Sequence, residues 1–128
     1  MLPVECVIDE SGITAARGRA RLAIRLPWYR SLPLSTVRVE RLAIDGADIP
    51  LESVRFSLNE LNVTLEELED CTDDFWFVLD SAYLEFPASV EPGSSHEVAV
   101  TVSLFPPYIP GMKRANAQSA KLIAGEAP

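Results

Sequence analysis

Apolar residues recur at every second position in several short segments of this 128-residue chain. Between Arg19 and Leu26, alanine, leucine and isoleucine alternate with three arginines. The same alternation runs through residues 37–44, 54–58, 82–86 and 98–104. Successive side chains of a strand point to opposite faces, so this period indicates strands with one buried face and one solvated face. A chain built of such segments cannot be mainly helical.

Two local patterns fix how these strands begin and end. The apolar phase set by Val37 and Val39 shifts by one across Glu40–Arg41, which predicts a β-bulge that returns the later residues to the buried face. Asp45-Gly46 follows at once as a tight turn, and residues 91–94 (EPGS) form a second turn cluster. A shorter apolar run, Phe75–Val78, is interpreted as a strand buried on both faces.

One helix signal interrupts the strands. Thr64 followed three residues later by Glu67 fits a capping box, and the sequence predicts a short helix from there to about Cys71. Acidic residues crowd this segment and the residues after it as far as Asp74. A solvated charge run at the helix start is preferred over a calcium loop, because the central glycine of such a loop is missing.

The expected fold is therefore all-β, an antiparallel β-sandwich with one short connecting helix and an irregular C-terminal arm. A barrel is the alternative, but uneven strands and prolines at 27, 33, 50 and 87 suit the edges and corners of a sandwich. We expect the sandwich domain to cover residues 1–110. Three prolines between 106 and 110 end the last strand, and residues 111–128 are expected to form the arm.

Charge and hydropathy exclude some classes of function. Nineteen acids against eleven lysines and arginines give a net charge of −8, which argues against nucleic acid as a partner. No segment approaches the roughly 18 apolar residues of a membrane span, so no membrane association is expected. The N-terminus lacks the pattern of a secretory signal, so a cytoplasmic protein is expected.

No catalytic or metal-binding constellation is visible, and we expect no catalytic residue, metal site or cofactor on this chain. His96 is the only histidine, and it is interpreted as a strand residue with a solvent or backbone hydrogen bond. Cys6 and Cys71 are far apart and are expected to be free thiols.

The loop between Leu26 and Ser35 is unusual because it is apolar and aromatic where a loop is normally polar. Trp, Tyr and Arg are favoured at the centres of protein interfaces. Two interpretations stay open: the loop contacts a partner, or it folds over the end of the sandwich as part of the core. The interface interpretation assigns a partner contact to Pro27, Trp28, Tyr29, Arg30, Leu32, Pro33, Tyr108 and Ile109.

This loop also carries a resemblance. LPWYRSLPLSTV at residues 26–37 resembles the small β subunit of bacterial C-glycoside deglycosidases, and further matching motifs follow in order from there to Pro110. These motifs are Ile44-Asp45-Gly46, Ile49-Pro50, Val54-Arg55-Phe56, Leu65-Glu66-Glu67-Leu68, Trp76, Pro92-Gly93, His96-Glu97-Val98 and Tyr108-Ile109-Pro110.

The resemblance implies a non-catalytic subunit of a carbon–carbon lyase, paired with a TIM-barrel α subunit in a hetero-oligomer. The complex is expected to cleave the C–C bond between a 3-oxo-glucosyl group and an aromatic aglycone, as in flavonoid C-glycosides. A divalent metal of the Mn or Mg type is expected on the α subunit. The alternative function is a stand-alone immunoglobulin-like module that binds a carbohydrate or peptide through Trp28 and Tyr29.

Overall fold

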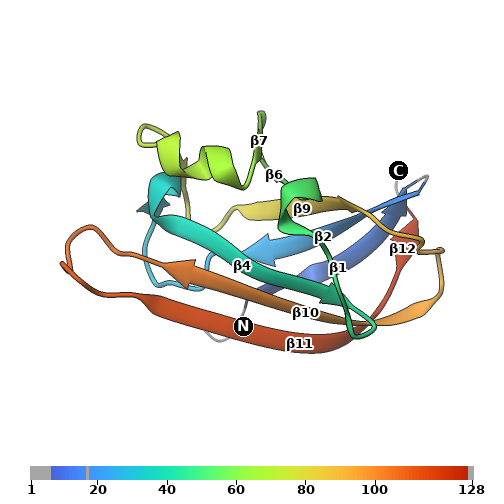
Figure 1. The fold of residues 1–128 in the computed structure, drawn as a ribbon. Coiled ribbons are helices and arrows are strands. Elements are labelled where there is room, and N and C mark those ends of the chain that lie inside the picture. The colour runs from blue at the N-terminus through green and yellow to red at the C-terminus, as the bar shows by residue number, and fades with distance from the viewer. Residues whose placement is uncertain (1–6, 17, 127–128) are drawn as a thin grey trace.

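The computed structural model describes residues 7–16 and 18–126, so Cys6 lies outside the described residues. Two sheets face each other across one core, as Figure 1 shows. The larger sheet has the strand order β12-β1-β2-β9-β6-β7, and the smaller has the order β11-β10-β4-β5. A third, two-stranded sheet joins β3 to β8. The prediction of an all-β sandwich is confirmed.

The described elements follow one another along the chain, and none of them is a long helix. In order they are β1 (Ile8–Ala16), β2 (Arg19–Arg25), β3 (Leu32–Pro33), η1 (Leu34–Thr36), β4 (Val37–Ile44), β5 (Ala47–Asp48), η2 (Leu51–Ser53), β6 (Arg55–Leu58), β7 (Leu61–Thr64), η3 (Glu66–Asp70), β8 (Phe75–Trp76), β9 (Ser81–Pro87), β10 (Ser95–Leu104), β11 (Arg114–Ile123) and β12 (Gly125–Glu126). Among the described residues, no helix is long and apolar enough to cross a membrane.

The strands pair antiparallel except for β1 and β12, which pair parallel. The inward faces of both sheets supply the core, and their largest side chains exclude solvent almost completely. The core side chains include Leu22, Ile24, Leu42, Phe56, Leu84, Phe86, Val98, Val100, Val102 and Leu104. Burial of this apolar surface supplies most of the driving force for folding.

The predicted bulge and turn in β4 are confirmed. Thr101 of β10 faces Arg41 while Val102 faces Val39, so Glu40 is the extra residue in β4. Beyond β4, Asp45 and Gly46 both have positive φ, 52° and 84°. This is the backbone of a tight hairpin turn, which matches the twist of the flanking strands.

The predicted helix is also present, as the 3₁₀ helix η3. The backbone N–H of Thr64 donates to Glu67 Oε1 at 2.8 Å, and the N–H of Glu67 donates to Thr64 Oγ1 at 3.2 Å. These bonds form the expected capping box, and the contacts to Thr64 lower the pKa of Glu67. Leu68 is fully buried and anchors η3 to the core.

The expectation of an irregular arm after residue 110 is wrong for most of that segment. Arg114–Ile123 forms β11, which pairs with β10 at ten positions from Ser95↔Ile123 to Leu104↔Arg114. The inward side of β11 carries Asn116 and Gln118, so the apolar alternation that reveals a strand is missing. Gln118 Oε1 instead accepts the backbone N–H groups of Val7 and Ile8, both at 2.8 Å. Backbone pairing and this amide contact hold the segment in place.

The interpretation of Phe75–Val78 as a strand buried on both faces is also wrong. Only Phe75–Trp76 is a strand, β8, and it pairs with β3 through Leu32↔Trp76 and Pro33↔Phe75. Trp76 is fully buried and its Nε1–H donates to the carbonyl of Asp80 at 2.8 Å, whereas Phe75 and Phe77 are exposed. The run is aromatic because one ring fills the core and two rings face outward.

We expect Gln118→Ala to lower the free energy of unfolding by about 1–3 kcal/mol, because two part-buried N–H groups lose their acceptor. Urea unfolding followed by circular dichroism measures the change. Ser119→Ala is the matched control, since this neighbouring side chain is exposed on the outer face of β11. Equal stability of the two variants would mean that Gln118 does not hold the strand.

Candidate interaction surface

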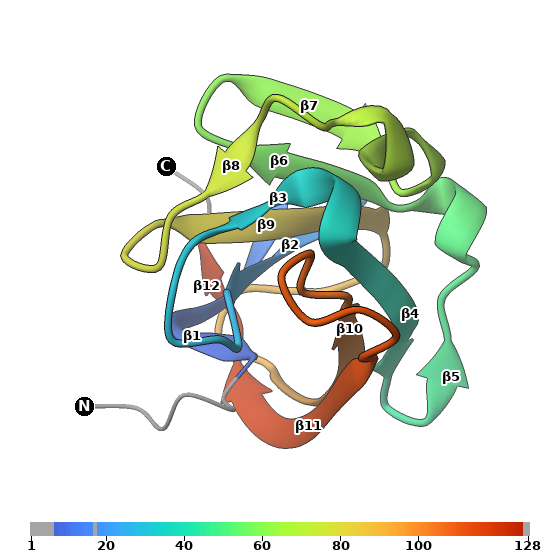
Figure 2. The ribbon, with the colours of Figure 1, turned by 90° about the vertical axis from the view of Figure 1, so that its left-hand side faces the viewer.

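Three loops meet at one end of the sandwich, which faces the viewer in Figure 2. They are residues 26–31 before β3, 77–80 between β8 and β9, and 105–113 between β10 and β11. The β3–β8 pair joins the first two, and the N–H of Val78 also donates to Ser31 Oγ at 3.2 Å. Trp28 Nε1–H donates to the hydroxyl of Tyr108 at 2.5 Å, which joins the first loop to the third. The loops therefore form one connected surface.

Several of the predicted contact residues lie inside this chain's own core. Trp28 is 9% exposed and Leu32 is 1% exposed, and both belong to the main hydrophobic cluster. Pro27 is buried and Pro33 is half-buried. The packing of Trp28 and Leu32 is the arrangement that the core interpretation of the loop describes. A partner contact by these residues stays a prediction.

The other predicted contact residues face outward. Tyr29 is 64% exposed, and Tyr108 and Ile109 are also exposed. The guanidinium of Arg30 lies 5.0 Å from the centre of the Tyr108 ring, a cation–π distance. A hydrogen bond with the hydroxyl of Tyr108 raises the pKa of Tyr29. The structure thus brings residues from positions 29–30 and 108–109 together, as the sequence hypothesis requires.

A third group at this end of the sandwich was not predicted from the sequence. Phe77 is 57% exposed and Leu79 is 94% exposed, and the Phe77 ring centre lies 6.5 Å from that of Phe75. The signal was the alternation of exposed Phe75, Phe77 and Leu79 with Trp76 and Val78, hidden in a run interpreted as wholly buried. We call the exposed set the apolar end: Tyr29, Phe75, Phe77, Leu79, Tyr108 and Ile109. Exposed apolar side chains on neighbouring loops make this end a candidate interaction surface.

A small hollow of about 250 Å³ opens beside Leu79. Arg25, Asp80 and Ser81 line it together with Asp9, and Ser81 Oγ donates to Asp9 Oδ2 at 2.8 Å. The Arg25 Nε atom is buried and has no hydrogen-bond acceptor among the described residues. The apolar end is therefore not flat, because the side chain of Leu79 projects next to a polar hollow.

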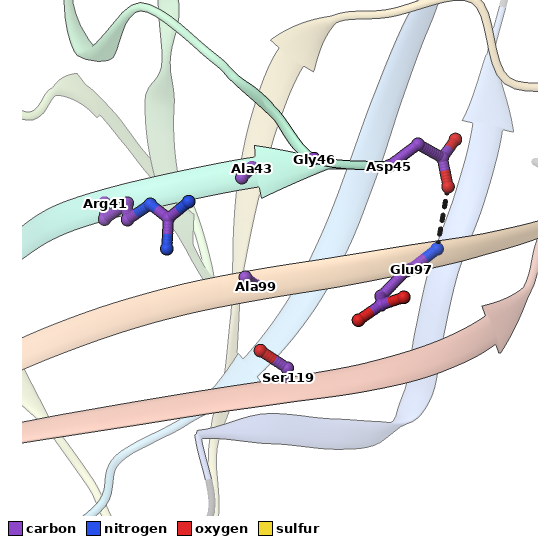
Figure 3. Close-up of a pocket in the computed structure, with 7 residues that line it drawn as sticks. All are labelled: Arg41, Ala43, Asp45, Gly46, Glu97, Ala99 and Ser119. Carbon is purple, nitrogen blue, oxygen red and sulfur yellow. Dashed lines mark hydrogen bonds between the residues drawn. The ribbon is translucent and has the colours of Figure 1, made fainter.

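A second pocket, of about 360 Å³, lies on the outer face of the four-stranded sheet and is shown in Figure 3. Arg41 stands at one side, and Asp45 and Glu97 at the other, above a floor of small residues that includes Ala43 and Ala99. The Glu97 N–H donates to Asp45 Oδ1 at 2.9 Å. Arg41 Nε is paired with Asp48 of β5 at 3.0 Å, so its charge is already compensated.

His96 lies at the end of the sandwich opposite the apolar end, at the start of β10. Its Nδ1 is 2.7 Å from Asp45 Oδ2, and its Nε2 is 2.7 Å from Ser94 Oγ. This order of side chains is that of a Ser-His-Asp triad, whose aspartate was not predicted from the sequence. Asp45 is 51 residues away from His96, and only the pairing of β4 with β10 brings them together.

The hydrogen-bonded group of Ser94, His96 and Asp45 joins two turns of the chain, and we call it the clasp. Ser94 Oγ donates its proton to the carbonyl of Glu91 at 2.5 Å. The nearby N–H groups of Gly93 and Ser94, which an oxyanion hole would need, donate to the carbonyls of Ala124 and Glu91. His96 therefore links the turn at 91–94 to the turn at Asp45.

Among the described residues, the remaining titratable groups do not form a metal-binding cluster. In the described ranges, no group of three or more His, Cys, Asp or Glu side chains is arranged to hold a metal ion. Cys71 is a free thiol, and burial followed by nearby carboxylates raises its pKa, which keeps it protonated.

We expect Trp28→Ala to destabilise the isolated chain by about 3–5 kcal/mol, because it empties a packed core position and removes the bond to Tyr108. Tyr29→Ala, at the neighbouring exposed position, is the control and should leave the thermal midpoint nearly unchanged. Differential scanning calorimetry of both variants measures this. A stable Trp28→Ala variant would contradict the core position of the ring.

The clasp predicts a pH dependence. The hydrogen bond to His96 and then the Glu97 N–H lower the pKa of Asp45. A lowered folded pKa means that the stabilisation is complete above the unfolded value, about 3.9, and is lost as the pH falls through the folded pKa. Asp45→Asn should therefore be less stable than the native chain at pH 6, with the difference shrinking below about pH 4. Asp73→Asn, in the exposed acidic run, is the control; a difference independent of pH would exclude the clasp.

The comparisons with known proteins agree on one family. The family model described as C-glycoside deglycosidase beta subunit matches residues 15–108. The chain is 38% identical over 109 residues to a C-glycoside deglycosidase beta subunit of Microbacterium trichothecenolyticum, covering 85% of this chain and 82% of the relative.

Two further relatives are similarly close. A 3'-dehydrocarminate deglycosidase beta subunit of a Microbacterium species is 38% identical over 106 residues, which is 83% of this chain and 80% of the relative. A C-glycoside deglycosidase beta subunit of Arthrobacter globiformis is 38% identical over 104 residues, 80% of this chain and 79% of the relative. Because the match spans both sheets and reaches from β1 to the loop that carries Tyr108, the chain belongs to the C-glycoside deglycosidase beta-subunit family.

Proposed function

We propose that this chain is the non-catalytic β subunit of a C-glycoside deglycosidase built of an α and a β subunit. Its role is to assemble with the catalytic α subunit, a TIM barrel, and to stabilise it. The membership of the chain in the β-subunit family supports this proposal most strongly, since the relatives are named as β subunits of deglycosidases. The apolar end supports it from the structure, because exposed aromatic and aliphatic side chains suit an interface with another protein better than free solvent.

The reaction that we propose for the complex cleaves the C–C bond between a 3-oxo-glucosyl group and an aromatic aglycone. A 3-keto group acidifies the neighbouring C2–H, and a base removes that proton to give an enolate. The enolate electrons form the C1–C2 double bond as the aglycone leaves from C1 and takes up a proton. A divalent metal of the Mn or Mg type on the α subunit would supply charge stabilisation for the enolate.

Two observations on the described residues of this chain support placing those steps on the other subunit. The nearest approach to a catalytic arrangement is the clasp, and the Ser94 proton there is already bonded to a backbone carbonyl. The acidic run after Thr64 lies on η3 and the following turn, where the Glu67 carboxylate caps the helix. We therefore place the base, the acid and the metal on the α subunit.

The stand-alone carbohydrate- or peptide-binding module is less well supported. A sugar platform needs an exposed aromatic face, but Trp28 is almost fully buried. The rings of Trp28 and Tyr29 are also inclined at 40° to each other, so they do not make one flat surface.

The purified chain alone should show no turnover of a 3-oxo-C-glucoside, and adding the separately produced α subunit should give turnover. Chromatography of released aglycone measures both. The α subunit alone is the control, and its activity should rise on addition of this chain if the β subunit stabilises it. Turnover by the purified chain with no α subunit detectable by mass spectrometry would contradict the non-catalytic role.

A further inference from the structure

We propose that the apolar end docks onto the α subunit and that two oppositely charged flanks fix the orientation of docking. This inference rests on the proposed function, because it takes the α subunit as the occupant. It goes further by assigning the contact to the β8–β9 loop as well as to the loops at Tyr29 and Tyr108. It also states what the α subunit presents there: an apolar centre between a cationic side and an acidic side.

The centre of the surface is apolar and held rigid. Leu79 has 94% of its surface exposed, and Phe77 beside it has 57%. The loop that carries them is fixed by the β3–β8 pair, by the bond from the Val78 N–H to Ser31 Oγ, and by Trp76 in the core. A rigid apolar surface loses little conformational entropy on docking, so most of the gain from burial is kept.

The flank before β8 is acidic. Asp70, Asp73 and Asp74 are exposed there, and the carbonyl of Asp74 accepts the Leu34 N–H at 2.8 Å, which fixes the segment next to β3. Glu69 is not available to a partner in the same way, because Arg38 Nε lies 3.2 Å from its Oε1. A partner that covers Phe75 must approach these carboxylates.

The flank on the other side is basic. Figure 2 shows β8 near the top of this end and the start of β11 lower down. Arg30 is exposed against Tyr108, and the exposed guanidinium of Arg114 lies 5.9 Å from the Trp28 ring centre. Lys113 is paired with Glu40 at 2.8 Å, which leaves the two arginines as the cations offered to a partner.

Opposite charges on two sides of an apolar centre permit one orientation of a complementary face and disfavour the reversed one. The net charge of −8 gives the whole chain an attraction for a cationic face, but it does not set direction. The direction of docking is set by the separation of the acidic flank from the basic flank. We assign the surface to the α subunit because the relatives are named β subunits, which implies a second kind of subunit. A two-fold contact with a second copy would also bring an acidic flank to a basic flank, so the oligomeric state of the chain alone is part of the test.

The apolar part of the proposal is tested with the double variant Phe77→Ser, Leu79→Ser. Both side chains are mostly exposed, so folding should be preserved, as circular dichroism can verify. Binding to the separately produced α subunit, measured by isothermal titration calorimetry, should weaken by more than tenfold. Ile123→Ser is the matched control: Ile123 is 73% exposed at the other end of the sandwich, and this variant should bind as the native chain does.

The charged flanks are tested with Asp73→Lys, Asp74→Lys on one side and Arg114→Glu on the other. Each should weaken binding by about three- to tenfold at low salt and less at high salt, while Glu91→Lys at the opposite end should not.

Unchanged affinity of the Phe77, Leu79 variant overturns the docking surface and leaves the proposed function standing. Failure of the native chain to bind the α subunit overturns both. Dimerisation of the chain alone that the double variant abolishes would assign the surface to a second copy and overturn the proposal.

Discussion

The fold depends on the pairing of β10 with strands on both of its sides. β11 matches it at ten positions, and β4 matches it from Val37 to Ile44 with Glu40 as a bulge. The inward side of β10 supplies four fully or almost fully buried side chains to the core. The same strand connects the two ends of the sandwich, since His96 stands at its start and the loop with Tyr108 follows its last residue.

Where the buried face is apolar, the sequence was sufficient to predict the structure. β2, β4, β9 and β10 alternate as expected, and the capping box at Thr64 and the turn at Asp45 are local signals with local outcomes. β11 was missed because Gln118 faces inward to bind backbone groups about 110 residues away, a requirement that no local pattern reveals. β1 was missed for a related reason: its pairing with β2 shifts between Ile8 and Ile13, so its alternation is interrupted.

The candidate surface was predicted only in part. Phe77 and Leu79 were missed because the local sequence does not show which side chains of their run face outward. Tyr29, Tyr108 and Ile109 stand out in sequence because loops are normally polar. Phe77 and Leu79 do not, because an apolar run with Trp76 in it looks like core. Only the tertiary placement of Trp76 decides that its neighbours face outward. In the same way, the partner of His96 could not be found without the β4–β10 register.

The clasp at one end of the sandwich contributes to stability, and the apolar end is the proposed interaction surface. At the apolar end, Trp28 contributes to both. At the clasp, polar groups are bonded to one another, whereas at the apolar end exposed side chains sit directly on buried ones. Trp28 is buried, yet its Nε1–H holds the exposed Tyr108. A partner that binds only the native state adds to its stability, so a loss of native structure appears as a loss of affinity. In the proposed complex, a change at Trp28 is therefore expected to weaken assembly even if the ring does not contact the other subunit. Affinity per folded molecule is consequently the quantity that separates a contact residue from one that supports a contact residue.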